Sequence, residues 1–223
     1  MNKIIGSLAL LWSSQLMAGS GIYLGGALGY GVFNYAPEIQ FTFAPMDLHA
    51  QLDQQAATTG FLATPILGVV GQWDRFRLET EIQAFWTSVP VRLVDDGGSW
   101  TKITFDHEYV WLLRPGYQIY REVPLFIYAS GGVTRAEISS EVQMDGLAAA
   151  GFGTDTVWGY KVGGGLGYLV QDHWEIRFDY LYSAYSTISN EAGADLGAPT
   201  LIPVYFDVDT SQSQYLLGLT YTW

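Results

Sequence analysis

Alternation between apolar and polar residues is the feature that most constrains how this chain can fold. Successive side chains of a β-strand point to opposite faces, so alternation with a period of two indicates a strand whose two faces meet different surroundings. The last segment of the chain shows the pattern most clearly. One of its faces carries Tyr215, Leu217, Leu219, Tyr221 and Trp223. We therefore predict a terminal strand with one broad apolar and aromatic face.

The same alternation recurs along the chain and predicts eight strands. Four segments alternate clearly, over 75–86, 108–118, 174–182 and 214–223. Four more, over 21–31, 60–71, 124–136 and 156–170, alternate less clearly because glycines interrupt the pattern. We interpret the glycine runs at 25–29 and 163–167 as room for large neighbouring side chains, since no helix follows that would make a phosphate-binding loop.

The segments between these strands alternate in length, which indicates how the strands are connected. Short turns are predicted at 71–74, 121–124 and 171–173, and long loops at 32–59, 88–105, 137–155 and 187–210. Short turns on one side and long loops on the other are typical of outer-membrane barrels. We therefore predict an all-β fold, an eight-stranded antiparallel transmembrane β-barrel. Ten strands are the alternative, because 36–43 and 201–208 also alternate.

The composition fits a chain that exposes little polar surface to water. Only 14% of its 223 residues are charged, whereas about a quarter are charged in an average soluble domain. The net charge of −12 argues against a nucleic-acid partner, because phosphates need Lys or Arg for neutralisation. The chain has no cysteine, which excludes disulfide bonds, thiol catalysis and a lipoprotein anchor.

The N-terminus has the three regions of a secretory signal peptide. Lys3 is followed by the apolar run 4–12 and then by small and polar residues. We expect cleavage after Ala18 or after Ser20, so that 1–18 is the signal peptide and 19–223 forms the barrel. No segment reaches the ~20 apolar residues that a spanning helix requires. Export without a spanning helix leaves the periplasm, the medium or the outer membrane. The alternating strands and the long and short connectors favour the cell outer membrane of a Gram-negative bacterium.

The polar faces of the predicted strands carry a balanced set of charges. Five cations and five anions lie there: Arg75, Arg77, Arg114, Lys161 and Arg177, and Glu79, Glu81, Glu108, Glu175 and Asp179. Charges in a narrow lumen must pair, because an unpaired buried charge is strongly destabilising. We therefore predict a lumen closed by a network of these residues. The alternative is a secreted β-sandwich or lipocalin-like barrel, whose polar face would meet water and need no such balance.

These features together resemble the small eight-stranded outer-membrane barrels of the OmpA transmembrane-domain, OmpX and opacity-protein type. The resemblance covers essentially the whole mature chain. It is most specific at the end, where Gly218, Leu219, Tyr221 and Trp223 are similar to the assembly signal of that family. Two departures are Leu217, where the family favours a polar residue, and Trp223, where Phe is commoner. The resemblance implies insertion by the barrel-assembly machinery.

The resemblance also implies ion pairs that cross the lumen. We expect Glu79 and Arg114 to form one of them, since both lie on predicted inward faces. A long loop centred near residue 96, joining adjacent strands in simple register, would place the two residues opposite each other.

No catalytic, cofactor-binding or metal site is predicted. The catalytic candidates are His49, His107 and His173, and His107 lies between Asp106 and Glu108. Neighbours on a strand point to opposite faces, so these acids do not converge with His107 on one site. A lipid A-modifying enzyme would need a His, an acid and a Ser at one rim, and an omptin-like protease would need paired acids beside a His. These two classes are the enzyme alternatives.

The loop side of the predicted barrel is strongly acidic. Its bases are Arg92, Lys102 and Arg135, against a large excess of Asp and Glu. We therefore predict a structural or surface-interaction role of the adhesin type, through acidic extracellular loops. The expected partners are outer-membrane lipid and lipopolysaccharide, the assembly machinery, and a host or surface ligand at the loops, without a cofactor. The alternative to this role, besides the enzymes, is a small channel for ions or small solutes.

Overall fold

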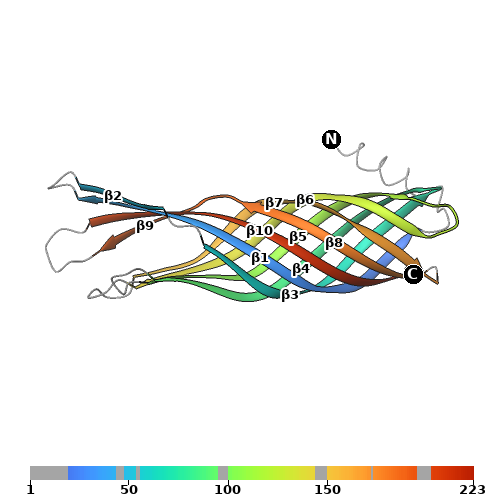
Figure 1. The fold of residues 1–223 in the computed structure, drawn as a ribbon, viewed down its shortest axis with the longest axis horizontal. Helices are drawn as coiled ribbons and strands as arrows, with labels where there is room; N and C mark the ends of the chain where they lie inside the picture. The colour runs from blue at the N-terminus through green and yellow to red at the C-terminus, as the bar shows by residue number, and fades with distance from the viewer. Residues whose placement is uncertain are drawn as a thin grey trace, which may run out of the picture.

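The computed structural model describes residues 20–43, 48–53, 56–94, 100–143, 150–171, 173–194 and 202–223. These residues form β-strands, with tight turns at one end of the molecule (Figure 1). Among them, no helix is long and apolar enough to cross a membrane. The predicted signal peptide, 1–18, lies outside the described residues, so its cleavage site stays a prediction.

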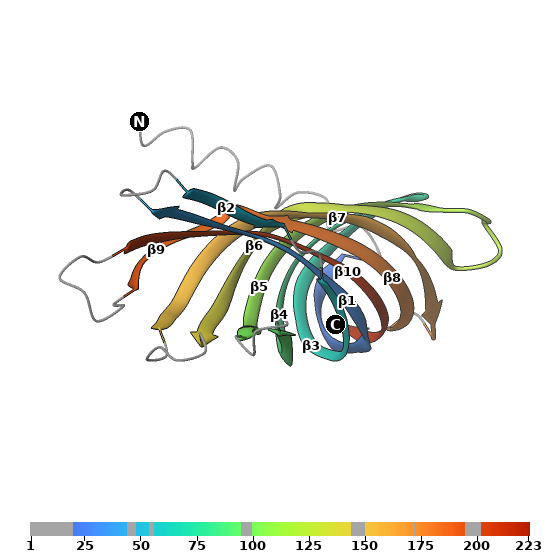
Figure 2. The same ribbon diagram turned by 60° about the vertical axis from the view of Figure 1, so that its left-hand side comes forward.

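The strands form one closed antiparallel sheet. They are β1 (Gly21–Phe43), β2 (Leu48–Asp53), β3 (Ala56–Trp73), β4 (Phe76–Val94), β5 (Trp100–Gln118), β6 (Leu125–Gln143), β7 (Ala150–Val170), β8 (Trp174–Tyr185), β9 (Ile188–Ala194) and β10 (Ile202–Thr222). Their hydrogen-bonded order is β2-β1-β3-β4-β5-β6-β7-β8-β10-β9, and a further pairing between β1 and β10 closes the barrel. Figure 2 shows the strands wrapping around the barrel.

The described backbone divides into ten strands, but the barrel wall has only eight positions around its circumference. We call each position a stave; it consists of one strand or of two strands in line. β2 pairs with 38–43 of β1 and β3 pairs with 21–35, so β2 continues β3 along the same neighbour. β9 continues β8 along β10 in the same way, after a break at 186–187. The predicted eight-stranded barrel is therefore confirmed and the ten-strand alternative is wrong. Of the alternating segments 36–43 and 201–208, the first and residues 202–208 of the second are the ends of β1 and β10 that lie away from the short turns, and residue 201 lies outside the described residues.

The four predicted long loops are mostly strand, which corrects the sequence prediction. β1 extends to Phe43, β4 to Val94 and β6 to Gln143, and β10 begins at Ile202. Strands of about 9–11 residues span a membrane, whereas β1 has 23 residues. The staves therefore rise above the membrane on this end, which we call the loop side; the end with the short turns is the turn side. Apart from 36–43 and 202–208, the alternation fades on the loop side, because outward side chains there no longer face lipid.

The two faces of the wall differ as the alternation predicts. On β10, Leu217 exposes 61% of its surface and the adjacent Leu216 exposes 1%. Exposed aromatic residues lie on the turn side at Trp73, Phe76, Trp174 and Trp223, and farther along the staves at Tyr30, Phe61, Trp86 and Tyr109. Aliphatic residues such as Leu24 and Ile82 lie exposed between these two groups of aromatic residues. Two aromatic girdles around an apolar belt are the exterior of a transmembrane barrel.

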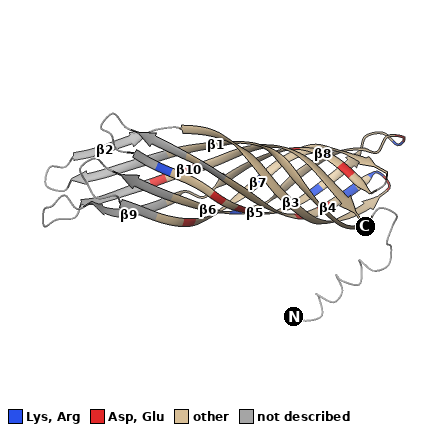
Figure 3. Cartoon of the chain, turned by 90° about the horizontal axis from the view of Figure 1, so that it is seen from below, with Lys and Arg blue, Asp and Glu red and all other residues tan. Residues whose placement is uncertain are grey.

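Side chains fill the lumen, and their character changes along its axis. Charged residues gather in the turn-side half, where Figure 3 shows several of them close to the short turns. Apolar residues fill the loop-side half, where Phe105 packs against Phe33 and Tyr185 with ring centroids 5.5 and 5.4 Å apart. The interior of an eight-stranded barrel is just wide enough for side chains, so the filled lumen follows from the number of staves.

Single-cysteine variants at neighbouring positions of β10 test the assignment of the two faces. The chain has no cysteine of its own, so each variant carries one thiol. Leu217→Cys faces lipid and should react with a membrane-soluble maleimide in intact outer membranes. Leu216→Cys is the matched control, because it faces the packed lumen and should stay unlabelled. Equal labelling of the two variants would contradict the topology.

Candidate functional site

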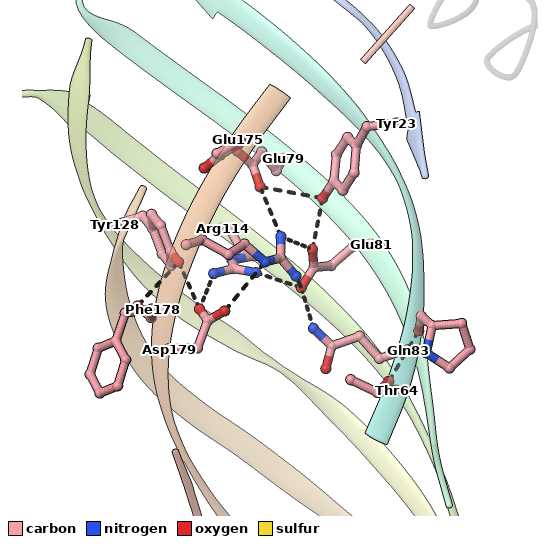
Figure 4. A network of polar contacts seen from close by, with 12 residues as sticks. Tyr23, Thr64, Glu79, Glu81, Gln83, Arg114, Tyr128, Glu175, Phe178 and Asp179 are labelled. Atoms are coloured by element: carbon pink, nitrogen blue, oxygen red, sulfur yellow. Dashed lines mark hydrogen bonds and ion pairs between the residues drawn. The ribbon is translucent and has the colours of Figure 1, made fainter. Parts of the chain in front are cut away.

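Nine of the ten residues that the sequence predicts for the lumen are buried inside the barrel. They come from β4, β5, β7 and β8, and each exposes 6% or less of its surface: Arg77, Glu79, Glu81, Glu108, Arg114, Lys161, Glu175, Arg177 and Asp179. Figure 4 shows the turn-side part of this network. The side chains form three connected groups, two on the turn side and one nearer the loop side.

The central group is a square of two arginines and two carboxylates. Glu81 of β4 accepts hydrogen bonds from Arg114 Nη1 at 2.7 Å and from Arg177 Nη1 at 2.8 Å. Asp179 of β8 completes the square, because it accepts from Arg114 and lies 3.3 Å from Nε of Arg177. Tyr128 of β6 donates its hydroxyl to Asp179 at 2.8 Å. Each charge in the square therefore has two neighbours of opposite sign.

The second group lies nearer the short turns and holds one cation between two carboxylates. Nε of Arg77 lies 2.5 Å from Glu79 Oε1, and Nη2 donates to Glu175 Oε2 at 2.5 Å. The hydroxyl of Tyr23 on β1 donates to Glu81 at 2.8 Å and to Glu79 at 3.3 Å, so it links this group to the square. Taken together, three arginines face four carboxyl groups in the turn-side network.

These contacts cross the full width of the lumen. Three staves separate β4 from β8 in either direction around the ring, so the two strands stand opposite each other. The Arg177–Glu81 and Arg77–Glu175 ion pairs both join β8 to β4. A solute that moved along the axis would have to separate these ion pairs. The turn-side lumen is therefore closed by direct contacts between opposite walls.

The third group is built around Glu108 of β5. Nζ of Lys161 lies 2.8 Å from Glu108 Oε1, and the hydroxyls of Tyr185 and Thr134 each donate to the same oxygen at 2.7 Å. Gln214 of β10 donates to Glu108 Oε2 at 3.1 Å and accepts from Lys161 at 2.9 Å. β5 and β10 also stand opposite each other in the ring. A second set of contacts thus closes the lumen at another height.

Arg75 is the predicted lumen residue that the structure places elsewhere. It lies in the turn between β3 and β4, and its Nε and Nη2 donate to the backbone oxygen of Gln118 at 3.0 and 2.7 Å. Its guanidinium carbon lies 4.6 Å from the ring centroid of Tyr117. The prediction extended the inward face one residue too far, because β4 begins at Phe76 and a turn residue does not follow the alternation.

The predicted ion pair between Glu79 and Arg114 does not form, although the predicted register is correct. The two residues are direct partners in the β4–β5 ladder. Glu79 instead contacts Arg77, and Arg114 contacts Glu81 and Asp179. Register fixes which Cα atoms are neighbours. The guanidinium group of an arginine lies several ångströms from its Cα atom, so it can reach carboxylates on other strands and at other heights along the barrel axis.

The uncharged members of the network are not among the ten predicted lumen residues. Tyr23, Tyr128 and Tyr185 are buried and donate to its carboxylates, and Gln83 donates to Glu81 at 2.6 Å. Gln83 does lie on the polar face of the alternating segment 75–86. The tyrosines carry no comparable signal, because tyrosine is also typical of the lipid-facing girdles.

Two glycines make room for the charged side chains. A Cβ atom on Gly218 of β10 would lie 3.0 Å from Cγ of Arg177. A Cβ atom on Gly167 of β7 would collide with the carboxylate of Glu175. Gly167 belongs to the run 163–167, so the steric role predicted for that run is confirmed at this position, whereas the sequence predicts no such role for Gly218. At both positions a Cβ atom would displace a member of the network.

The two histidines whose side chains the structure describes, His107 and His173, do not converge on one site. His107 lies on β5 toward the loop side, and His173 lies in the turn between β7 and β8. Nδ1 of His173 is 3.1 Å from the backbone oxygen of Thr222. The side chain of His49 lies outside the described part of the structure. Within the described ranges, no group of three or more potential metal ligands occurs.

The predicted assembly signal forms the turn-side end of β10. Leu219 and Trp223 are exposed to the lipid side, and Tyr221 packs edge-on against Trp174 and Trp223 with ring centroids 4.9 and 5.2 Å apart. The backbone N–H of Trp223 donates to the oxygen of Ile22 at 3.1 Å, so the last residue also belongs to the seam that closes the barrel. The role of this segment in assembly stays a prediction.

Comparisons with known proteins identify the fold. No protein-family model matches the chain, and no characterised protein matches its sequence. The outer membrane protein OprG from Pseudomonas aeruginosa has a similar structure, with a TM-score of 0.59 and 15% identity over 92% of this chain and 97% of OprG. Neisserial surface protein A aligns with a TM-score of 0.43 and 12% identity, over 92% of this chain and 98% of that one.

The chain has the fold of the small outer-membrane barrels. The fold-level resemblance predicted from the sequence is therefore confirmed. The exposed apolar belt between two aromatic girdles is the surface that such a barrel presents to lipid. Fold and exterior together place the protein in the outer membrane.

A double-mutant comparison distinguishes the observed ion pair from the register neighbour. Glu81→Gln and Arg114→Met each leave a buried charge short of a partner, so each should lower the free energy of unfolding by ~3–5 kcal/mol. The double variant should lose less than the sum, because Arg177 and Asp179 remain as a balanced pair. Glu79→Gln is the control, and it should couple only weakly to Arg114→Met.

Urea unfolding of the folded protein in detergent, followed by tryptophan fluorescence and by heat-modifiable migration on gels, measures these free energies. Additive losses for Glu81→Gln and Arg114→Met would contradict the square arrangement. So would a coupling between Glu79 and Arg114 as large as that between Glu81 and Arg114.

Replacing the terminal aromatic residues tests the predicted assembly signal. The variant Tyr221→Ser with Trp223→Ser should accumulate in the periplasm and reach the outer membrane in reduced amounts, because it lacks the aromatic end that the assembly machinery of the resembling family recognises. Tyr215→Ser, on the same face of β10 but outside the signal, is the matched control. Quantitative membrane fractionation is the readout. Normal levels of folded barrel in the outer membrane for the double variant would contradict the prediction.

Proposed function

We propose that this barrel is closed and acts through the part that rises above the membrane, in a structural or surface-interaction role of the adhesin type. The observation that carries the proposal is the set of contacts that join opposite staves across the lumen. A channel for ions needs a continuous aqueous path. Contacts at two heights argue against such a path.

Opening the lumen would require breaking buried ion pairs. Nine charged side chains there expose 6% or less of their surface. Leaving one such charge without its partner costs ~3–5 kcal/mol. Because the charges share partners, separating β4 from β8 would expose several of them at once. The sealed lumen is therefore the stable state, and ion conduction is not the expected role.

The part above the membrane supplies a surface of one dominant charge. β1 and β10 pair there, with β2 and β9 beside them, so this end is built of strands. We call it the acidic crown. Its described acids are Asp106, Glu137, Asp155, Asp207 and Asp209, and its described bases are Lys102 and Arg135. Such a surface attracts a cationic partner and repels polyanions.

A sideways path for small apolar molecules is the second candidate. The ladder between β3 and β4 ends at Ala63–Trp86, although β3 reaches back to Ala56 and β4 continues to Val94. Leu62 and Phe85 lie buried beside this point, in the apolar half of the lumen. A small apolar molecule that entered from the loop side could leave through the wall into lipid without crossing the ion pairs.

Reconstitution of the folded barrel separates these roles. Planar bilayers should show no stepwise ion conductance. Barrel in nanodiscs should bind a labelled oligolysine peptide and should not bind heparin. The variant Glu137→Gln with Asp207→Asn should bind oligolysine severalfold more weakly, because it removes two charges of the acidic crown. Glu122→Gln, in an exposed turn on the opposite side, is the matched control and should bind as the unmutated protein does.

Each outcome bears on one role. Conductance like that of a general porin would overturn the closed barrel. Oligolysine binding that is equal in the crown variant and in the control would overturn the surface role. Entry of a small apolar dye into proteoliposomes, faster than into protein-free vesicles and without ion conductance, would favour the sideways path.

A further inference from the structure

The outer face of the barrel is hollowed on the loop side of the second aromatic girdle. The hollow has a volume of about 660 Å³ and lies across β3, β1, β10 and β8, which are successive neighbours in the wall. Its lining includes the polar residues Asn34, Tyr182, Asp209 and Ser211. Its lining also includes the buried residues Tyr35, Tyr185 and Thr210, and Tyr185 belongs to the Glu108 group as well. None of the nine charged residues of the lumen network is among the lining residues.

Cross-strand register explains why the wall is hollow here. One row of direct partners around the four staves consists of small residues, namely Ala57, Asn34, Ser211 and Ala184. The row four residues nearer the membrane on the same staves consists of Phe61, Tyr30, Tyr215 and Tyr180. All four of these rings are exposed and belong to the girdle. The change from large rings to small side chains leaves the space.

The position of the hollow decides which molecules reach it. Four residues of strand span ~13 Å along a stave, and less along the membrane normal because staves are tilted. Aromatic girdles lie at the level of the lipid headgroups. The hollow therefore lies just above the headgroups and faces outward, at the level of the sugars that outer-leaflet glycolipids carry.

The chemistry of the lining favours an uncharged ligand that is rich in hydroxyl groups. The amide of Asn34, the hydroxyl of Ser211 and the carboxylate of Asp209 offer both donors and acceptors. Thr187 Oγ1 donates to Asp209 Oδ1 at 2.6 Å, which holds the carboxylate in place. The described lining residues include one acid and no Lys or Arg, so a phosphate or a carboxylate would be repelled. Tyr182 adds an aromatic ring on which a sugar ring can pack.

We propose that this hollow binds an uncharged sugar unit of an outer-leaflet glycolipid. The sugar ring packs on Tyr182, and its hydroxyl groups bond to Asn34, Asp209 and Ser211. The inference is independent of the proposed surface role, because the ligand belongs to the membrane in which the barrel itself sits. Binding there would anchor the base of the acidic crown to the surrounding glycolipid.

Two glycolipids in nanodiscs with the folded full-length barrel separate sugar binding from lipid binding. Rough lipopolysaccharide with a core of uncharged hexoses carries the proposed ligand. Lipid A alone has the same acyl chains and phosphates but lacks those hexoses. We expect the side-chain amide resonance of Asn34 and the backbone amide resonance of Ser211 to shift with the rough lipopolysaccharide only.

Variants of the lining test the site itself. Ala184→Phe fills the hollow with an outward ring like that of Tyr180 on the same stave, and it should weaken binding of rough lipopolysaccharide at least tenfold. Asn34→Ala removes an amide without adding bulk and should also weaken it. Thr156→Phe, at an exposed position of β7 outside the hollow, is the matched control. Heat-modifiable migration verifies that each variant is folded.

The outcomes are decisive in both directions. Equal shifts with lipid A alone would overturn the proposal, because acyl chains or phosphates would then be the ligand. Unchanged affinity in both Ala184→Phe and Asn34→Ala would overturn the site. A third arm titrates free core oligosaccharide. If it binds as tightly as the intact lipopolysaccharide, the site takes soluble glycans and the membrane glycolipid is the wrong source.

Discussion

The whole structure depends on one constraint, which is that backbone N–H and C=O groups in lipid can bond only to each other. A single strand cannot satisfy it, and an open sheet leaves two unpaired edges. The long β1–β10 ladder, from Tyr23–Thr222 to Phe41–Val204, removes those edges. Closure with eight staves then sets the diameter, and that diameter leaves room for side chains only. The polar inner face therefore has to satisfy itself inside the barrel.

The lumen meets this requirement by sharing partners. Glu81 contacts two arginines from two different staves, and Asp179 contacts the same two. Shared contacts hold opposite walls at a fixed separation, so the network acts as a brace across the barrel. A buried ion pair adds little net stability compared with apolar packing. A strand that slipped by one residue would turn these charges into the lipid, so their burial opposes such a slip.

Above the girdle the constraint relaxes, and the wall changes character. Water can form hydrogen bonds with the backbone N–H and C=O groups there, so the β3–β4 ladder can end at Ala63–Trp86. The outward-facing side chains can also be small or polar, because they no longer contact lipid. The row with Asn34 and Ser211 replaces aromatic rings that the same staves carry at the girdle. The acidic crown and the hollow at its base thus lie in the part of the wall that lipid does not shape.

The order of residues alone settled the two faces of the staves and nine of the lumen residues, because a strand has only two faces and lipid tolerates only one kind on the outside. It favoured eight staves but left ten open, and the pairing of β2 and β9 in the structure decided between them. It also settled the register between Glu79 and Arg114. It could not settle which charges meet. Arg177 and Glu81 are 96 residues apart and lie on opposite staves. Their contact therefore depends on the register shifts between neighbouring strands, which add up around the closed barrel. The length of the staves above the membrane was equally hidden, because backbone pairing continues there without an apolar outer face to mark it.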